Sequence, residues 1–173
     1  MIWTTSPSRP EQVLGLGASL SWKGFDFSFL MQGAFGATTY LTSGWYFQPF
    51  QAERDPKLMG NLITKFRDRW TEENPDPYAF SPRLYMGQNV NNYKSSTWWV
   101  RNSDYMRLKN LEFGYTLPRK ALDRMRLDNL RFYVSAQNLM TFSKFKKEFW
   151  DPEVGADAYP IQATVFLGVN LTF

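Results

Sequence analysis

The sequence predicts an all-β chain, with strands that belong to an antiparallel, up-and-down transmembrane β-barrel. The clearest observation is the last stretch, residues 161–173, where an apolar side chain occupies every second position from Ile161 to Phe173. Polar or small residues fill the alternate positions, with Phe166 as the exception. A strand of this length, tilted near 45°, rises roughly 30 Å, which is the thickness of a bilayer's hydrocarbon core. Most strands of soluble proteins are about half as long.

Composition is the second observation. Aromatic residues make up 18% of the chain, yet the mean hydropathy is −0.44, and no run approaches the roughly 18 apolar residues that a membrane helix needs. These values exclude a helical membrane protein. They are typical of a barrel, in which lipid-facing apolar residues alternate with lumen-facing polar ones.

The side chains that the chain lacks exclude several kinds of chemistry. The sequence has no cysteine and no histidine, so it offers no thiolate metal site, no Ser-His or Cys-His nucleophile and no imidazole base. We therefore expect no enzyme activity, no metal and no cofactor. The net charge of +4 is spread along the chain, without the basic stripe that nucleic-acid binding requires.

Two strands open the chain. In residues 12–22, leucines, an alanine and a tryptophan occupy every second position, and small residues occupy most of the positions between them. In residues 25–36, phenylalanines alternate with polar residues. Lys23 and Gly24 stand between the two strands, and a glycine at this point permits the positive φ of a two-residue hairpin turn. The segment 12–36 is therefore predicted to be a β-hairpin.

Alternation disappears over residues 37–98, a long segment rich in proline, asparagine and aromatic residues. A loop of this length usually has a function. Alternation returns in a strand predicted over 99–117 and in another over 129–141, joined by a short connection after Pro118. The apolar parity changes between Lys109 and Asn110, which predicts a β-bulge.

The fifth strand, 160–173, follows a second loop, 142–159. The up-and-down order places both long loops on one side of the membrane and both short turns on the other, as in bacterial outer-membrane barrels. Five strands are too few to close such a barrel, because the smallest have about eight. Residues 1–7 lack a signal peptide. We therefore expect this chain to be the C-terminal part of a longer polypeptide, or one piece of a barrel that another chain completes.

A family resemblance adds to this interpretation. Residues 103–118 read SDYMRLKNLEFGYTLP, residues 130–142 read LRFYVSAQNLMTF, and residues 151–153 read DPE. In this order they resemble the C-terminus of the SusC/RagA family, the TonB-dependent transporters of Bacteroidetes outer membranes. The stretch WKGFD at residues 22–26 is similar to an earlier hairpin of that family. Residues 37–95 match the family poorly.

The resemblance implies a barrel of about 22 strands with a plug in its lumen. Residues 1–173 would be a C-terminal segment of the barrel wall, with the plug and the TonB-contacting segment outside this chain. The whole receptor would import oligosaccharides or peptides across the outer membrane. Its partners would be a SusD-like surface lipoprotein, the TonB complex and outer-membrane lipid.

Two groups of candidate site residues follow. Aromatic residues of the two long loops are candidates for contact with cargo or with the lipoprotein, although membrane girdles and loop packing are commoner roles: Trp45, Trp70, Tyr93, Trp98, Trp99 and Trp150. Val169, Leu171 and Phe173 are candidates for a signal to the barrel-insertion machinery. Asp151 and Glu153 flank a proline, a pattern that most often turns or caps a loop.

Two other classes stay open. A soluble carbohydrate-binding β-sandwich would also show alternating strands and exposed tryptophans, but with shorter strands. Another outer-membrane barrel, such as a siderophore-type receptor, would share the membrane signals. Extraction behaviour separates the first of these alternatives from a barrel, because a sandwich dissolves without detergent.

Overall fold

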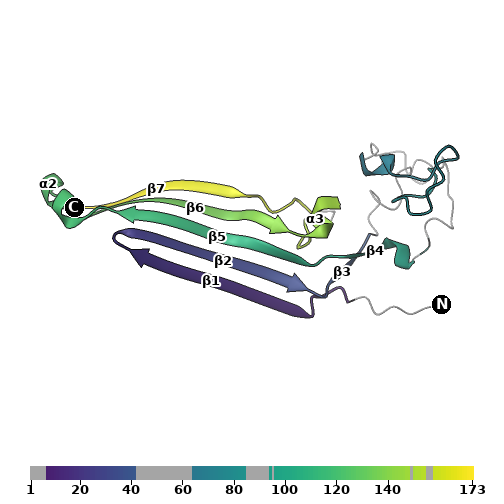
Figure 1. Cartoon of the computed structure of the whole chain (residues 1–173), viewed down its shortest axis with the longest axis horizontal. Coiled ribbons are helices and arrows are strands. Elements are labelled where there is room, and N and C mark those ends of the chain that lie inside the picture. Colours follow the sequence, from purple (N-terminus) through teal and green to yellow (C-terminus); the bar gives the residue numbers. More distant parts are fainter. Residues whose placement is uncertain (1–6, 42–63, 85–93, 95, 149, 155–157) are drawn as a thin grey trace. The chain divides into compact units, whose positions relative to one another are not determined.

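The structure is a computed structural model that describes residues 7–41, 64–84, 94, 96–148, 150–154 and 158–173. Its main feature is an antiparallel five-stranded sheet in the order β1-β2-β5-β6-β7 (Figure 1). The strands are β1 (Gln12–Trp22), β2 (Phe25–Phe35), β5 (Tyr105–Thr116), β6 (Asn129–Phe142) and β7 (Thr164–Thr172). The chain divides into two compact units, of which residues 1–39 and 101–173 form one and residues 40–100 the other.

The predicted hairpin is present as β1 and β2. Their register runs from Gln12 opposite Phe35 to Trp22 opposite Phe25, without a break. Lys23 (φ 48°) and Gly24 (φ 88°) both have positive φ, as a type I′ hairpin turn requires. Any side chain at Gly24 would come within 2.6 Å of the Thr116 carbonyl oxygen, so glycine is needed here for space as well as for φ.

The predicted bulge also lies where the parity changes. Leu30 pairs with Asn110 and Met31 with Leu108, so Lys109 is an extra residue relative to β2. The β5–β6 register shifts at the same level, where β6 has two residues, Asn138 and Leu139, opposite Lys109. Asn138, on the facing strand, has a φ of 52°. This irregularity returns the apolar residues on both sides of Lys109 to one face of the sheet.

The strand expected over 99–117 is shorter than predicted. Trp99 belongs to the 3-10 helix η3 (Thr97–Trp99), β4 (Val100–Asn102) pairs with β3 (Thr38–Tyr40), and the long strand begins only at Tyr105. Asp104 explains the break, because its backbone N–H donates to the Asn102 side chain at 2.7 Å. Its carboxylate accepts the backbone N–H of Gly36 at 2.7 Å. These local side-chain bonds compete with the sheet ladder.

The last strand also starts later than the expected residue 160, at Thr164. Before it, the loop expected over 142–159 contains the short helix α3 (Lys144–Glu148). At the other end, Asp128 N–H donates to the Thr172 carbonyl at 2.9 Å. This bond holds the end of β7 beside the connection that carries α2 (Arg119–Met125).

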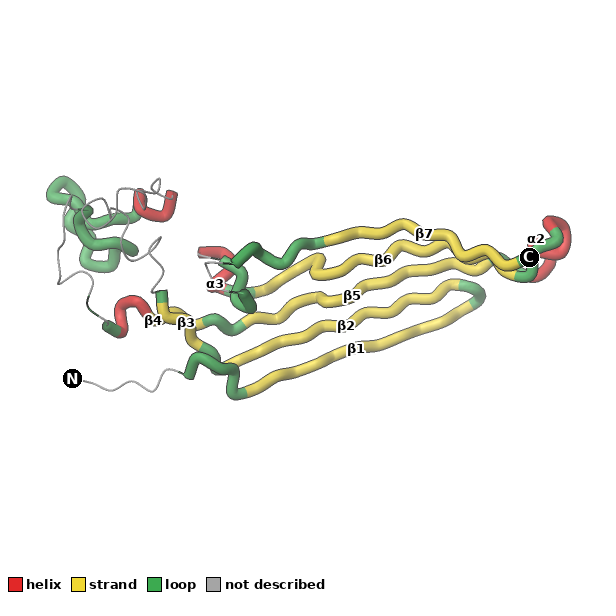
Figure 2. Tube along the Cα trace, turned by 180° about the vertical axis from the view of Figure 1, so that it is seen from behind, coloured by secondary structure: helices red, strands yellow, loops and turns green. Residues whose placement is uncertain are grey.

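The two ends of the sheet differ in their connections (Figure 2). One end carries the Lys23 and Gly24 turn and the connection through α2, and the opposite end carries α3 and the points from which the long loops leave. Short connections therefore share one end and long ones the other, as the strand order predicts. No helix in the described ranges combines the length and the hydropathy needed to span a bilayer.

The described residues of the second unit form a small aromatic core. Phe66, in the 3-10 helix η2 (Thr64–Arg67), packs near Phe80 with ring centroids 6.0 Å apart. Phe80 meets Trp99 edge-on at 6.4 Å. All three side chains are buried, so the described part of the 37–98 loop contributes Phe66 and Phe80 to a small packed cluster.

Candidate functional site: the two faces of the sheet

One face of the sheet is apolar from edge to edge. The observed register aligns its side chains in rows across the strands. The two rows nearest the short-turn end are Trp22, Phe25, Tyr115, Phe132, Val169 and Leu20, Phe27, Phe113, Val134, Leu167. The next two rows inward are Ala18, Phe29, Leu111, Ala136, Val165 and Leu16, Met31, Leu108, Met140.

This apolar face is open to its surroundings. Leu167 is 82% exposed, Leu20 68% and Trp22 64%. Monomeric soluble proteins seldom expose contiguous apolar patches larger than a few hundred Å². The face therefore has the character of a surface that contacts lipid, and the sheet buries few apolar residues of its own.

The opposite face is polar and carries an ion-pair triad. Arg131 on β6 donates to Asp26 on β2 at 2.5 Å and to Glu112 on β5 at 2.6 Å. The arginine side chain crosses over Gly114, where a Cβ would lie 2.6 Å from both the guanidinium and the Asp26 carboxylate. Because residue 114 is a glycine, the Arg131 side chain can link β6 to both β5 and β2. The alternating sequence pattern alone does not reveal this role of the glycine.

A second glycine on the polar face makes room for an aromatic ring. Tyr133 pairs with Gly168, and a Cβ at Gly168 would lie 2.2 Å from the tyrosine ring. The Arg131 guanidinium lies 5.0 Å from the centre of the same ring, within range of a cation–π contact. At these two positions of the polar face, a long side chain therefore lies over a glycine of a neighbouring strand.

The long-loop end of this face holds a buried charge cluster. The side chain of Arg107, on β5, is fully buried and donates to Asp151 at 2.7 Å. Its Nε lies 3.0 Å from Glu153. Lys109 and the Tyr105 hydroxyl also donate to Glu153, at 3.0 and 2.7 Å. Through these contacts, the cluster holds Asp151 and Glu153 of the 142–159 loop against β5.

This cluster corrects the interpretation of Asp151 and Glu153 as turn residues alone. Glu153 N–H does donate to the Asp151 carboxylate at 3.0 Å, so the turn exists. The carboxylates also balance the two cations Arg107 and Lys109, 44 residues away in the chain. From the sequence, the alternating pattern places Arg107 on the polar face of its strand. A charged residue there needs an acidic partner, but the pattern does not identify which residue that is. The described residues contain no group that could hold a metal ion.

The loop aromatic residues lie in different environments. Trp98 is 39% exposed and donates from its indole to the Phe80 carbonyl at 3.3 Å, whereas Trp99 is buried in the second unit. The Trp70 backbone N–H donates to Ser81, and the Trp150 indole donates to Ala158 at 2.9 Å. Trp45 and Tyr93 lie outside the described residues. Trp98 and Trp150 therefore present more surface to a partner than Trp99 does.

The candidate assembly residues share the apolar face of β7. Val169 pairs with Phe132 and Leu171 with Leu130. Phe173 follows the strand and is highly exposed. β7, which carries Val169 and Leu171, is an edge strand of the observed sheet. Their part in assembly stays a prediction.

Comparison with known proteins identifies relatives, although no protein-family model matches the chain. TonB-dependent receptor P26 of Formosa agariphila is 30% identical over 185 residues, which cover 95% of this chain and 17% of the receptor. TonB-dependent receptor P3 of the same organism is 27% identical over 184 residues, covering 95% of this chain and 16% of the receptor. The chain thus spans about a sixth of the length of these relatives.

Solved structures show the same fold. The RagAB peptide transporter aligns with a TM-score of 0.69 and 25% identity, over 96% of this chain and 17% of the other. The RagAB peptide importer in its open-open state aligns with a TM-score of 0.68 and 24% identity, with the same coverage. Together with the exposed apolar face, these matches confirm the resemblance and the fold class inferred from the sequence: the chain is similar to a segment of TonB-dependent receptors and has the fold of a segment of the RagA barrel.

Proposed function

We propose that this chain forms part of the outer-membrane wall of a TonB-dependent importer. The observation that carries the proposal is the division of one sheet into an exposed apolar face and a polar face with Arg131, Asp26 and Glu112. Lipid accepts the first face, and a water-filled lumen accepts the second. We assign residues 1–173 to a C-terminal segment of the barrel, with the plug and the TonB-contacting segment in other parts of the receptor.

The cargo of such an importer would be oligosaccharides or peptides, delivered with the help of a SusD-like lipoprotein. The names of the similar structures, a peptide transporter and a peptide importer, favour peptides. The RagAB complexes also support a lipoprotein partner on the outer side. Energy would come from the inner-membrane TonB complex, through the part of the receptor outside this chain.

The 37–98 loop is the proposed contact with the lipoprotein or the cargo. It leaves from the long-loop end of the sheet, and it carries several of the large aromatic residues that dominate binding hot spots. Tyr78 is 87% exposed, and Trp98 is partly exposed. The buried Phe66, Phe80 and Trp99 give these side chains a firm base.

Uptake by cells tests the proposal. A strain that lacks the full-length receptor, complemented with the wild-type gene, should take up labelled oligopeptides or oligosaccharides only when TonB is present. Uptake that persists without TonB, or a receptor that fractionates outside the outer membrane, would contradict the proposal. The two cargo classes are supplied separately, so the same assay identifies the substrate.

A loop variant tests the contact surface separately from the barrel. Deleting residues 54–82 should leave folded, heat-modifiable barrel in the outer membrane while abolishing uptake or capture of the lipoprotein. A milder pair, Tyr78→Ala with Trp98→Ala, retains the buried residues of the unit and should reduce capture partially. Tyr159→Ala, which alters an exposed tyrosine of the other loop, serves as the control. Unchanged uptake after the deletion would refute the contact.

The β-sandwich alternative is weaker, because a sandwich buries one face of each sheet against the other. Here the apolar face stays exposed over the described strands. A siderophore-type receptor would share the barrel wall, and the cargo arms of the uptake assay separate it from the proposed importer.

A further inference from the structure

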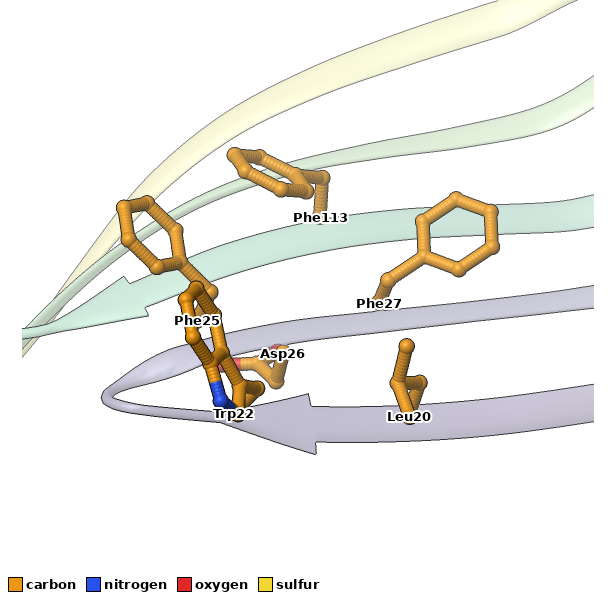
Figure 3. Close-up of a pocket in the computed structure, with 6 residues that line it drawn as sticks. All are labelled: Leu20, Trp22, Phe25, Asp26, Phe27 and Phe113. Atoms are coloured by element: carbon orange, nitrogen blue, oxygen red, sulfur yellow. The ribbon is translucent and has the colours of Figure 1, made fainter.

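An apolar pocket opens on the exposed face of the sheet, at its short-turn end. Its volume is about 360 Å³, and it is lined by Leu20, Trp22, Phe25, Asp26, Phe27 and Phe113. Figure 3 shows these side chains gathered around the end of the β1–β2 hairpin. The Phe25 ring lies 5.9 Å from the Phe113 ring and 4.5 Å from the Tyr115 ring, so the aromatic residues form one packed layer beside the pocket.

Asp26, the acidic residue of the pocket lining, does not make the pocket repel anions. Asp26 belongs to the opposite parity of β2, and its carboxylate is paired with Arg131 at 2.5 Å. That negative charge is therefore neutralised on the polar side of the sheet. The remaining lining residues are aromatic or aliphatic, which suits an acyl chain.

Positive charge borders the same end of the face. The Lys23 Nζ lies 4.8 Å from the centre of the Trp22 ring, so its ammonium group stands at the rim of the pocket. The neighbouring connection adds Arg119, Lys120, Arg124 and Arg126, all exposed, against two acidic residues, Asp123 and Asp128. No ion pair joins any of these five cations to an acidic residue within the described part of the chain.

We propose that this pocket and its cationic rim form a binding site for an anionic phospholipid. One acyl chain lies along Trp22, Phe25 and Phe113, and the phosphate group meets Lys23 and the basic connection after Pro118. Basic residues beside an apolar surface are the ordinary means by which proteins select anionic lipids. The inference rests on the proposed membrane location. Outer-membrane barrels have their short turns on the periplasmic side, so this end of the sheet would lie at the periplasmic leaflet.

Native mass spectrometry of the full-length receptor tests the site. The delipidated receptor in detergent is titrated with phosphatidylglycerol and, separately, with phosphatidylcholine. The wild-type receptor should bind phosphatidylglycerol more tightly. Lys23→Gln should weaken phosphatidylglycerol binding about fivefold and leave phosphatidylcholine binding unchanged. Trp22→Ala should weaken binding of both lipids, because it removes part of the acyl-chain surface.

Matched controls isolate the pocket from general membrane contact. Lys146→Gln changes an exposed lysine at the long-loop end, and Leu14→Ala trims the same face of β1 away from the pocket. Both should bind lipid like the wild type. Glycerol phosphate, which lacks acyl chains, should not compete at equal concentration, and competition by it would overturn the assignment of an acyl-chain site.

Heat-modifiable migration of each variant reports whether the barrel is folded. A folded, outer-membrane receptor with equal affinity for the two lipids, or with a preference for phosphatidylglycerol that Lys23→Gln does not reduce, would overturn the lipid site and leave the transport proposal intact. A receptor absent from the outer membrane would overturn the transport proposal and the lipid site with it.

Discussion

The two faces of the five-stranded sheet share one backbone and differ in how their side chains are stabilised. On the apolar face, large side chains such as Leu167 and Trp22 remain exposed, and their burial depends on a surrounding apolar phase. On the polar face, Arg131 links Asp26 and Glu112 across three strands, and Arg107 is fully buried with Asp151. The polar face therefore supplies specific contacts within the chain, whereas the apolar face supplies a surface suited to lipid.

The largest effect is expected from breaking the buried cluster. Asp151→Ala leaves Arg107 without its shorter ion pair, and uncompensated buried charges typically cost about 3 to 5 kcal/mol. Thermal unfolding of the full receptor, together with protease cleavage of the 142–159 loop, measures the loss. The exposed pair of Arg83 and Glu72, at 63% and 67% side-chain exposure, is the control, since Glu72→Ala should cost at most about 1 kcal/mol. Equal effects of the two variants would contradict the structural role of the cluster.

An arginine placed on each face should have opposite consequences for stability. Leu167→Arg should destabilise the inserted barrel by about 2 to 4 kcal/mol, because the charge enters lipid near the midplane. Ser135→Arg lies at nearly the same depth on the opposite face, opposite Glu112 and Phe166, and should be tolerated. Denaturant unfolding in bilayers gives both values. Similar costs at the two positions would show that the faces are wrongly assigned.

The glycine beneath Tyr133 offers a finer test of the polar face. Gly168→Ala forces a Cβ to within 2.2 Å of the tyrosine ring and should cost about 1 to 3 kcal/mol by overpacking. Tyr133→Ser should relieve that clash, so the double variant should be less unstable than the sum of the single changes. A double-mutant cycle in the folded receptor measures this coupling. Strict additivity would mean that the ring does not lie over Gly168.

The smallest effect on stability is expected at the end of the chain's last strand. Phe173→Ala removes a highly exposed ring, so the folded barrel should lose little thermal stability. If Phe173, Val169 and Leu171 form an insertion signal, the amount of folded barrel in the outer membrane should instead fall severalfold, with material accumulating in the periplasm. Normal insertion with reduced heat resistance would indicate an interfacial anchor.

Much of the sheet follows from local sequence. Alternation predicts β1 and β2, the turn residues Lys23 and Gly24 predict their hairpin, and the parity change locates the bulge at Lys109. These features depend on residues that are close in the chain. The break before Tyr105 was not predicted, because Asn102 and Asp104 act through side-chain hydrogen bonds that interrupt an otherwise strand-like pattern.

The polar contacts of the site were less accessible to sequence reasoning. Arg131 and Asp26 are 105 residues apart, and only the observed register shows that Gly114 leaves space between them. Likewise, the partner of Arg107 is in a loop that carries no alternation. Parity identifies the face on which a charged residue lies, whereas its partner depends on strand order and on the path of the loops.

Site-directed spin labelling along β6 can show which face of the sheet contacts lipid. The chain has no cysteine, so single cysteines at positions 130 to 137 can be labelled one at a time, in a full receptor otherwise free of cysteine. In bilayers, labels at 130, 132, 134 and 136 should show high accessibility to oxygen, which concentrates in lipid. Labels at 131, 133, 135 and 137 should show low oxygen accessibility. Accessibility that fails to alternate, or that alternates in the opposite phase, would contradict the assignment of the apolar face to lipid and of the polar face to the lumen.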